Sequence, residues 1–253
     1  MKIFVIAKNT FKEIIRDKIL YNILFFAILM IGASVLLGKL SLGEQLKVIE
    51  DMGLACISVF GTLIAIFVGI SLVFKEIDKR TIYTIIAKPV TRTEFLLGKF
   101  LGLVLILLIN IIIMSGCFES IIFMISNSLN LELMKAVILI FAELVVITSI
   151  AVMFSTFSTP FLSGIFTLAF YVIGNFSMDI KNLGEKSNGL VRAFTSVIYY
   201  ILPNLDNFDI KGKVVHNELV SYEFMVYSII YGILYVSVVL IISVIIFQKR
   251  DFK

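Results

Sequence analysis

Six long apolar runs constrain this chain more than any other feature of its sequence. Each is close to the roughly 20 residues that an α-helix needs to cross the hydrocarbon core of a bilayer. Of the 253 residues 60% are hydrophobic and 16% are charged, and the mean hydropathy is +1.06. A soluble domain would expose far more charge than this, so the sequence predicts a multi-pass protein of the cell membrane. The predicted spans are 20–37, 53–74, 100–125, 134–158, 161–178 and 224–247.

The runs are continuous rather than alternating apolar and polar residues. Because backbone groups in lipid must be satisfied within the chain, such runs favour helices over a barrel. The predicted fold is therefore all-α, a polytopic membrane protein with six transmembrane helices in a single transmembrane domain, residues 1–253. No small-residue cleavage site follows the first run, so we expect it to be retained as a helix.

The distribution of lysine and arginine predicts the orientation, since both are retained on the cytoplasmic side. With the N-terminus inside, the outer side carries only Lys39, Lys47, Lys135 and five basic residues of a long loop, 179–223. We therefore expect that both termini are cytoplasmic and that 179–223 is extracytoplasmic. The fourteen inner basic residues are Lys2, Lys8, Lys12, Arg16, Lys18, Lys75, Lys79, Arg80, Lys88, Arg92, Lys99, Lys249, Arg250 and Lys253.

The leader, 1–19, has the pattern of an amphipathic interfacial helix. Apolar residues recur at three- and four-residue spacing, and charged residues occupy the opposite side. Two interpretations remain open: a simple membrane anchor, or a helix that wraps the cytoplasmic ends of neighbouring spans and frames a docking cleft. The apolar residues are Ile3, Phe4, Ala7, Phe11, Ile14 and Ile15.

The connection between the second and third spans, residues 75–99, is a dense basic stretch that we call the coupling segment. Residues 79–87 predict about two helical turns, and Pro89 ends them because it lacks an N–H and disfavours helical geometry at Lys88. Thr91 and Glu94 then fit a capping box directly before an apolar run. We expect a helix, a turn and a second helix on the inner face, although an ordinary solvated loop is also compatible with the charge.

Three motifs give the chain a resemblance to a known family. They are Glu76 and Thr81 followed by residues 88–92, Phe95 and residues 98–99; the leader stretch 9–18; and the late stretch 202–208. In this order on six spans, they resemble the permease subunits of type 2 ABC exporters, particularly the group named for multicopper-enzyme maturation.

The resemblance implies a transport subunit rather than an enzyme, paired as a homodimer or heterodimer, with a separate ABC ATPase subunit on its cytoplasmic face. ATP and magnesium would bind in that partner, and the chain indeed lacks a phosphate-binding loop. Hydrolysis would drive export through the dimeric pathway, and the coupling helix would fall within 76–88. The expected docking residues are Glu76, Lys79, Arg80, Thr81, Ile82, Tyr83, Ile85, Ile86, Lys88, Pro89 and Arg92.

Two polar residues fall deep inside predicted spans. At about 1.5 Å per residue, Asn110 and Glu143 both lie roughly 18 Å from the inner edge of the hydrocarbon core. An ionisable residue at such a depth usually faces other helices and has a function. We expect Glu143 to find a donor on a neighbouring span, with Asn110 the first candidate, or to carry a proton. A polar clamp between helices and a proton relay remain the two roles open to it.

The remaining spans offer weaker signals. Tyr227, Tyr231 and Tyr235 recur at four-residue spacing in the last span, either for packing or to line a pathway. The small and polar residues of the fifth span suit close helix contact. From these residues and partly from the family resemblance, we place a dimer seam near spans one and five. Within the outer loop, residues 190–201 predict an amphipathic helix. It rests on the outer leaflet or, as the resemblance implies, acts as an external gate.

Several other functions have little support in the sequence. A secondary transporter would need inverted repeats, and a membrane-embedded enzyme would need catalytic groups clustered at one depth; both remain alternatives that lack an ATPase partner. The net charge of +4 fits attraction to anionic membrane lipid, so we expect no nucleic-acid partner. Cys56 and Cys117 lie in apolar runs and His216 is the single histidine, so we expect no metal site.

Overall fold

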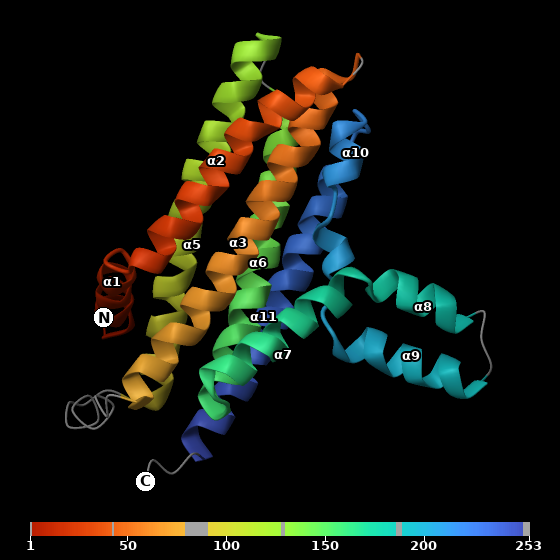
Figure 1. The fold of residues 1–253 in the computed structure, drawn as a ribbon. Coiled ribbons are helices and arrows are strands. Elements are labelled where there is room, and N and C mark those ends of the chain that lie inside the picture. Colours follow the sequence, from red (N-terminus) through yellow and green to blue (C-terminus); the bar gives the residue numbers. More distant parts are fainter. Residues whose placement is uncertain (1, 42, 79–90, 128–129, 186–188, 250–253) are drawn as a thin grey trace.

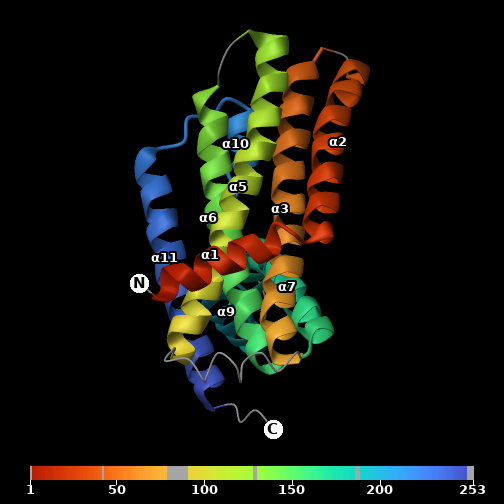
Figure 2. The same cartoon turned by 90° about the vertical axis from the view of Figure 1, so that its left-hand side faces the viewer.

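The computed structural model describes residues 2–41, 43–78, 91–127, 130–185 and 189–249, and these residues form helices and no strand. Long helices run up and down the bundle, and a short helix, α1, lies across it (Figures 1 and 2). The all-α fold class is therefore confirmed. The first elements are α1 (Lys2–Ile14), α2 (Lys18–Leu40), α3 (Gln45–Asp78), α5 (Arg92–Ser126), α6 (Leu131–Phe157) and α7 (Pro160–Asn175).

Five of these helices are long and apolar enough to cross a membrane, namely α2, α3, α5, α6 and the last helix, α11 (Tyr222–Lys249). The predicted fifth span is different. Its helix α7 has 16 residues, which is about 24 Å of helix. The chain then bends by 58° into α8 (Ser177–Glu185), so a sixth span exists only if this broken pair counts as one.

The core of the bundle lies between α3 and α6. In each of these helices 72% of the most apolar window is buried, against 22% in α2 and 28% in α11. Helix α6 packs against α3, α5, α7 and α11, among other elements, and is enclosed by them. Large apolar side chains on the outside of the bundle, such as Phe25 and Phe26 of α2, face the lipid expected around a membrane protein.

Helix α1 packs on α5, and Figure 2 shows it crossing the bundle. Its buried residues are Ala7, Thr10 and Ile14. Phe4 and Ile15, which the sequence placed on the lipid-facing side, are 75% and 37% exposed. The structure therefore shows the leader wrapping a neighbouring span. The predicted segment 1–19 is also divided, because Asp17 caps α2 by accepting a hydrogen bond from the Ile19 N–H (3.0 Å).

The predicted outer loop, 179–223, is largely helical. It contains most of α8, then α9 (Gly189–Ile201), η1 (Leu205–Phe208) and α10 (Lys211–Val215). The amphipathic helix expected at 190–201 is confirmed by α9. Helices α8 and α9 pack on each other and leave the bundle sideways, well short of the end that carries α10 (Figure 1). Instead η1 and α10 enter the bundle, where they pack on α3, α6 and α7.

Candidate functional site

Most of the expected docking residues lie outside the described residues. This holds for Lys79, Arg80, Thr81, Ile82, Tyr83, Ile85, Ile86, Lys88 and Pro89. Glu76 is described by its backbone, which continues α3 to Asp78. Arg92 is described in full, at the start of α5. The structure thus defines the two helices from which the coupling segment extends.

The start of α5 is fixed by the capping box that the sequence predicted. The Glu94 N–H donates to the Thr91 hydroxyl oxygen at 3.2 Å, and the Thr91 N–H donates to the Glu94 carboxylate at 2.9 Å. The two bonds give partners to the backbone N–H groups of Glu94 and Thr91, which have no carbonyl partner at the start of a helix. The helix therefore begins at a defined residue, directly after its capping residue Thr91.

Arg92 joins the base of α5 to the end of α11. Its Nη1 donates to the backbone carbonyls of Phe247 (3.0 Å) and Gln248 (2.8 Å). A cation suits this place because the last carbonyls of a helix carry partial negative charge. The rings of Phe95 and Phe247 stack beside it, with centroids 6.1 Å apart. Two helices far apart in sequence are thereby held together on the side of the coupling segment.

Two glycines of α5 let α1 approach closely. A Cβ atom at Gly98 would lie 2.7 Å from Ile6 Cβ, and one at Gly102 would lie 2.6 Å from Thr10 Cβ. Any side chain at these positions would push the helices apart. Between the glycines, the buried Lys99 pairs with Glu13 of α1 (3.2 Å). The sequence analysis did not find this contact, although two glycines four residues apart, hence on one helix face, could have indicated it.

The two deep polar residues do not meet as expected. Asn110 Nδ2 donates to the Ile106 carbonyl of its own helix (2.8 Å), and its buried Oδ1 has no partner in the described part of the chain. Glu143 is 1% exposed and forms a hydrogen bond with Asn175 of α7. Its Oε1 is without a partner among the described residues. Asn175 therefore takes the place predicted for Asn110, because Glu143 faces α7 and the inserted outer segment rather than α5.

The three regularly spaced tyrosines of α11, Tyr227, Tyr231 and Tyr235, separate into two groups. Tyr231 accepts a hydrogen bond from the Asn204 N–H (2.8 Å), and Tyr235 donates to the Ile201 carbonyl (3.3 Å). Both line a cavity of about 450 Å³ between α6, α7, α9 and α11. Tyr227 is 71% exposed and does not line it. The packing role is thus clear for two of them, and their role in a pathway stays a prediction.

A family model described as ABC-2 family transporter protein matches residues 4–252. The chain belongs to the ABC-2 transporter family. No curated protein matches it. Membership makes the chain a permease of an ABC transporter and a multi-pass membrane protein, in agreement with the resemblance found from its motifs.

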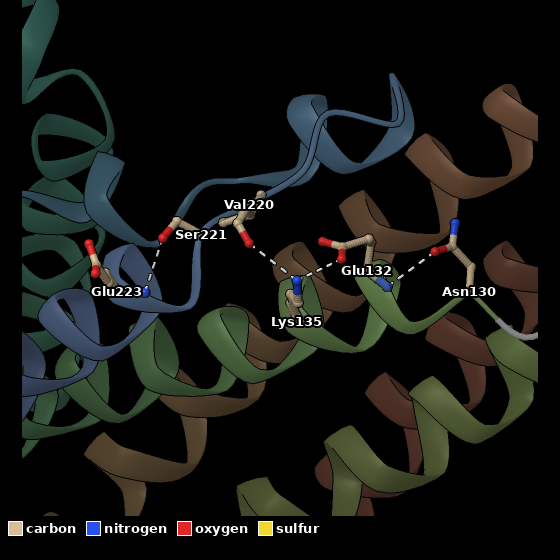
Figure 3. Close-up of polar contacts among 6 residues, drawn as sticks. All are labelled: Asn130, Glu132, Lys135, Val220, Ser221 and Glu223. Atoms are coloured by element: carbon tan, nitrogen blue, oxygen red, sulfur yellow. Dashed lines mark hydrogen bonds and ion pairs between the residues drawn. The ribbon is translucent and has the colours of Figure 1, made fainter.

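At the opposite end of the permease, Lys135 ties α6 to the segment before α11 (Figure 3). Its Nζ donates to Glu132 Oε1 (2.6 Å) and to the Val220 carbonyl (3.2 Å), and lies 4.3 Å from the centre of the Tyr222 ring. The residue is 8% exposed. Because a buried ammonium must be compensated, these contacts fix where α11 starts. The sequence analysis counted Lys135 only as an outer-side charge.

Behind α6, the inserted outer segment of the permease carries several charged groups. Asp206 Oδ2 accepts from the Met178 N–H (3.1 Å), and Lys211 Nζ lies 3.6 Å from Asp209 Oδ2. Burial is the main reason why the pKa of the Asp206 carboxyl is raised above its ordinary value, against the effect of the bond from Met178. The segment thus brings acids and a cation close to the deep carboxyl of Glu143.

Proposed function

We propose that this permease is driven by a separate ATPase subunit that binds its cytoplasmic face at the coupling segment, and that it exports its cargo. Family membership supports a transport role. The sequence contains no phosphate-binding loop of its own. ATP and magnesium would therefore be bound by the partner.

The observation that carries the proposal is the rigid base of α5. A partner can shift an equilibrium between two membrane conformations only through an element that moves with the spans. The capping box fixes the start of α5, Arg92 joins it to α11, and Gly98 with Gly102 holds α1 against it. A force applied to the coupling segment would consequently move α1, α5 and α11 together.

We also propose that two permease chains form the transport pathway, with the seam along α2 and α7. Both helices present large apolar side chains on their outer faces, including Phe25 and Leu29 of α2 and Phe161 and Phe166 of α7. Contact along α2 and α7 would leave the coupling segments of both chains on the same side of the membrane.

Copurification tests the docking site. A tagged permease is purified from its native membranes in mild detergent, and its partners are identified by mass spectrometry. We expect a protein with a phosphate-binding loop in the wild-type sample. It should be lost when Ile82, Tyr83, Ile85 and Ile86 are all replaced by serine, because burying these side chains would drive the docking.

The matched control replaces an exposed apolar residue at the other end of the molecule. Leu219 is 90% exposed, and Leu219→Ser should leave the ATPase bound. Equal membrane insertion of all variants, measured by protease protection, separates a docking defect from misfolding. Retention of the ATPase by the serine variant would show that the docking site lies elsewhere.

A further inference from the structure

The segment 203–215 is inserted into the bundle as a plug. Its apolar side chains Leu205, Phe208, Ile210 and Val214 are each 1% exposed or less. The Phe208 ring lies against Gly232 of α11, where an added Cβ would be 3.2 Å from it, and Val146 of α6 borders the same glycine. An extracytoplasmic connection has therefore become part of the packed core.

Polar contacts hold the start of the plug. The Ser228 hydroxyl donates to the Asn207 carbonyl, and the Ser177 hydroxyl donates to Asn204 Oδ1, each at 2.8 Å. With the Tyr231 bond to the Asn204 N–H, they satisfy backbone and amide groups that lipid would leave unpaired. These contacts join neutral groups, so they do not explain the charged residues farther along the plug.

The charges gather around Lys211. Its Nζ lies 3.3 Å from the hydroxyl oxygen of Ser58, which is buried in α3, and 3.6 Å from Asp209 Oδ2. Glu143 of α6 is attracted by Lys211 and repelled by Asp209 and Asp206. A carboxyl group that is 1% exposed and has one oxygen without a donor is costly to bury. A positive group nearby lowers this cost, as the hydrogen bond with Asn175 does.

A metal ion fits this place poorly, since the described residues contain no group of three or more His, Cys, Asp or Glu that could hold one. A primary ammonium fits better. It carries one positive charge and three donors. The site offers the carboxylate of Asp209 and the hydroxyl of Ser58 as direct partners, and the carboxyl of Glu143 attracts the charge from beyond hydrogen-bond distance.

We propose that Asp209 and Ser58, with the buried carboxyl of Glu143 behind them, form a partly buried receptor for one primary ammonium group, that Lys211 fills it in this conformation, and that its occupation keeps the plug in the bundle. The receptor is independent of the docking site on the cytoplasmic face. It can therefore be tested on the isolated permease, without nucleotide or ATPase.

The experiment measures how fast the plug, residues 203–215, leaves the bundle. The native cysteines are replaced (Cys56→Ala, Cys117→Ala), and Val146→Cys provides a reporter that is fully buried beside Phe208. A water-soluble maleimide labels it only when the plug has left. Met114→Cys on α5, also fully buried, reports general unfolding in a parallel sample.

Removal of the ammonium group should release the plug. We expect Lys211→Met, which keeps most of the side-chain volume, to raise the labelling rate of the Val146→Cys reporter about tenfold, because the buried Glu143 carboxyl loses its positive neighbour and the Ser58 hydroxyl loses a donor. Lys213→Met is the matched control. Lys213 is exposed on the ring of Phe224, and its loss should leave the rate unchanged.

Chemical rescue identifies the receptor. In Lys211→Ala, n-butylammonium should slow labelling toward the parent rate, whereas tetramethylammonium, which has no N–H donor, and butyrate should not. Rescue must disappear in the double variant Glu143→Gln with Lys211→Ala. The pair Glu143→Gln with Lys211→Met should be labelled more slowly than Lys211→Met alone, because no unpaired buried charge remains.

Three results would overturn the proposal. One is an unchanged labelling rate in Lys211→Met. Another is rescue by n-butylammonium that persists without the Glu143 carboxyl. The third is equal labelling of the Met114→Cys reporter in the same variants, which would mean that the whole bundle opens and that Lys211 holds no separate plug.

Discussion

At the scale of single residues, small and charged side chains set how closely the helices approach. Gly102 of α5 allows contact with α1, since a Cβ there would lie 2.6 Å from Thr10 Cβ and 2.9 Å from the Ala7 carbonyl oxygen. Neither neighbour can move without shifting the backbone of α1. Gly116, on the same helix, has nothing within 4 Å of such an atom.

These two glycines give a matched pair of substitutions. Gly102→Ala should destabilise the permease by about 1–3 kcal/mol through overpacking. Gly116→Ala should be neutral, or stabilising by up to about 1 kcal/mol through helix propensity. Thermal unfolding in detergent, followed by circular dichroism, measures both. Equal melting temperatures for the two variants would contradict the close packing of α1 on α5.

Lys135 and Lys47 provide a second pair, since both form ion pairs of similar length but differ in burial. The Lys135–Glu132 distance is 2.6 Å with the lysine side chain 10% exposed, and the Lys47–Glu44 distance is 2.8 Å with 43% exposed. Lys135→Met should cost about 1–3 kcal/mol because Glu132 and the Val220 carbonyl lose a buried donor. Lys47→Met should change stability by less than about 1 kcal/mol. The same unfolding assay distinguishes them.

At the scale of elements, α5 is longer than the hydrocarbon core of a bilayer is thick. Its 35 residues measure about 52 Å, against roughly 30 Å for the hydrocarbon core. Its base is therefore free to contact α11 outside the membrane, and Arg92 makes that contact through the carbonyls of Phe247 and Gln248.

Arg92→Ala should consequently loosen the end of α11. We expect amide hydrogen exchange in residues 244–249 to become about tenfold faster, because the last turn of a helix exchanges by local opening. Exchange in the middle of α11 should stay the same. Arg192→Ala serves as the control, since this exposed arginine belongs to α9. Unchanged exchange at 244–249 in Arg92→Ala would argue against a rigid unit of α5 and α11.

At the scale of the whole molecule, burial is uneven around the bundle. Helices α3 and α6 are enclosed, while α2 presents most of its apolar surface outward. Lipid can cover that surface, but so can a second permease, and in lipid the choice depends on close packing rather than on hydrophobicity.

Cysteine cross-linking tests the proposed seam in native membranes. With the native cysteines replaced by alanine, Leu29→Cys on α2, at a position 49% exposed, should form a disulfide-linked pair of permease chains on mild oxidation. Ile112→Cys on α5, 59% exposed, should stay monomeric. Cross-linking at both positions would indicate random collision, and at neither would contradict a homodimer along α2.

The sequence determined the features that depend on neighbours along the chain. Long apolar runs predicted the membrane and five of the spans, Thr91 and Glu94 predicted the start of α5, and the spacing of apolar residues predicted α9. Each depends on spacing within one helix or at its end. For the same reason the three motifs were enough to indicate the family.

The tertiary structure alone decided which helix face meets which partner. In a bilayer, the side facing lipid and the side facing protein are both apolar, so periodicity does not distinguish them. That is why the break after α7, the replacement of Asn110 by Asn175 beside Glu143, and the insertion of 203–215 were not found, and why the contact of α1 with a neighbouring span was one of two open interpretations. All four depend on contacts between residues distant in the chain, and only packing of the complete bundle brings these together.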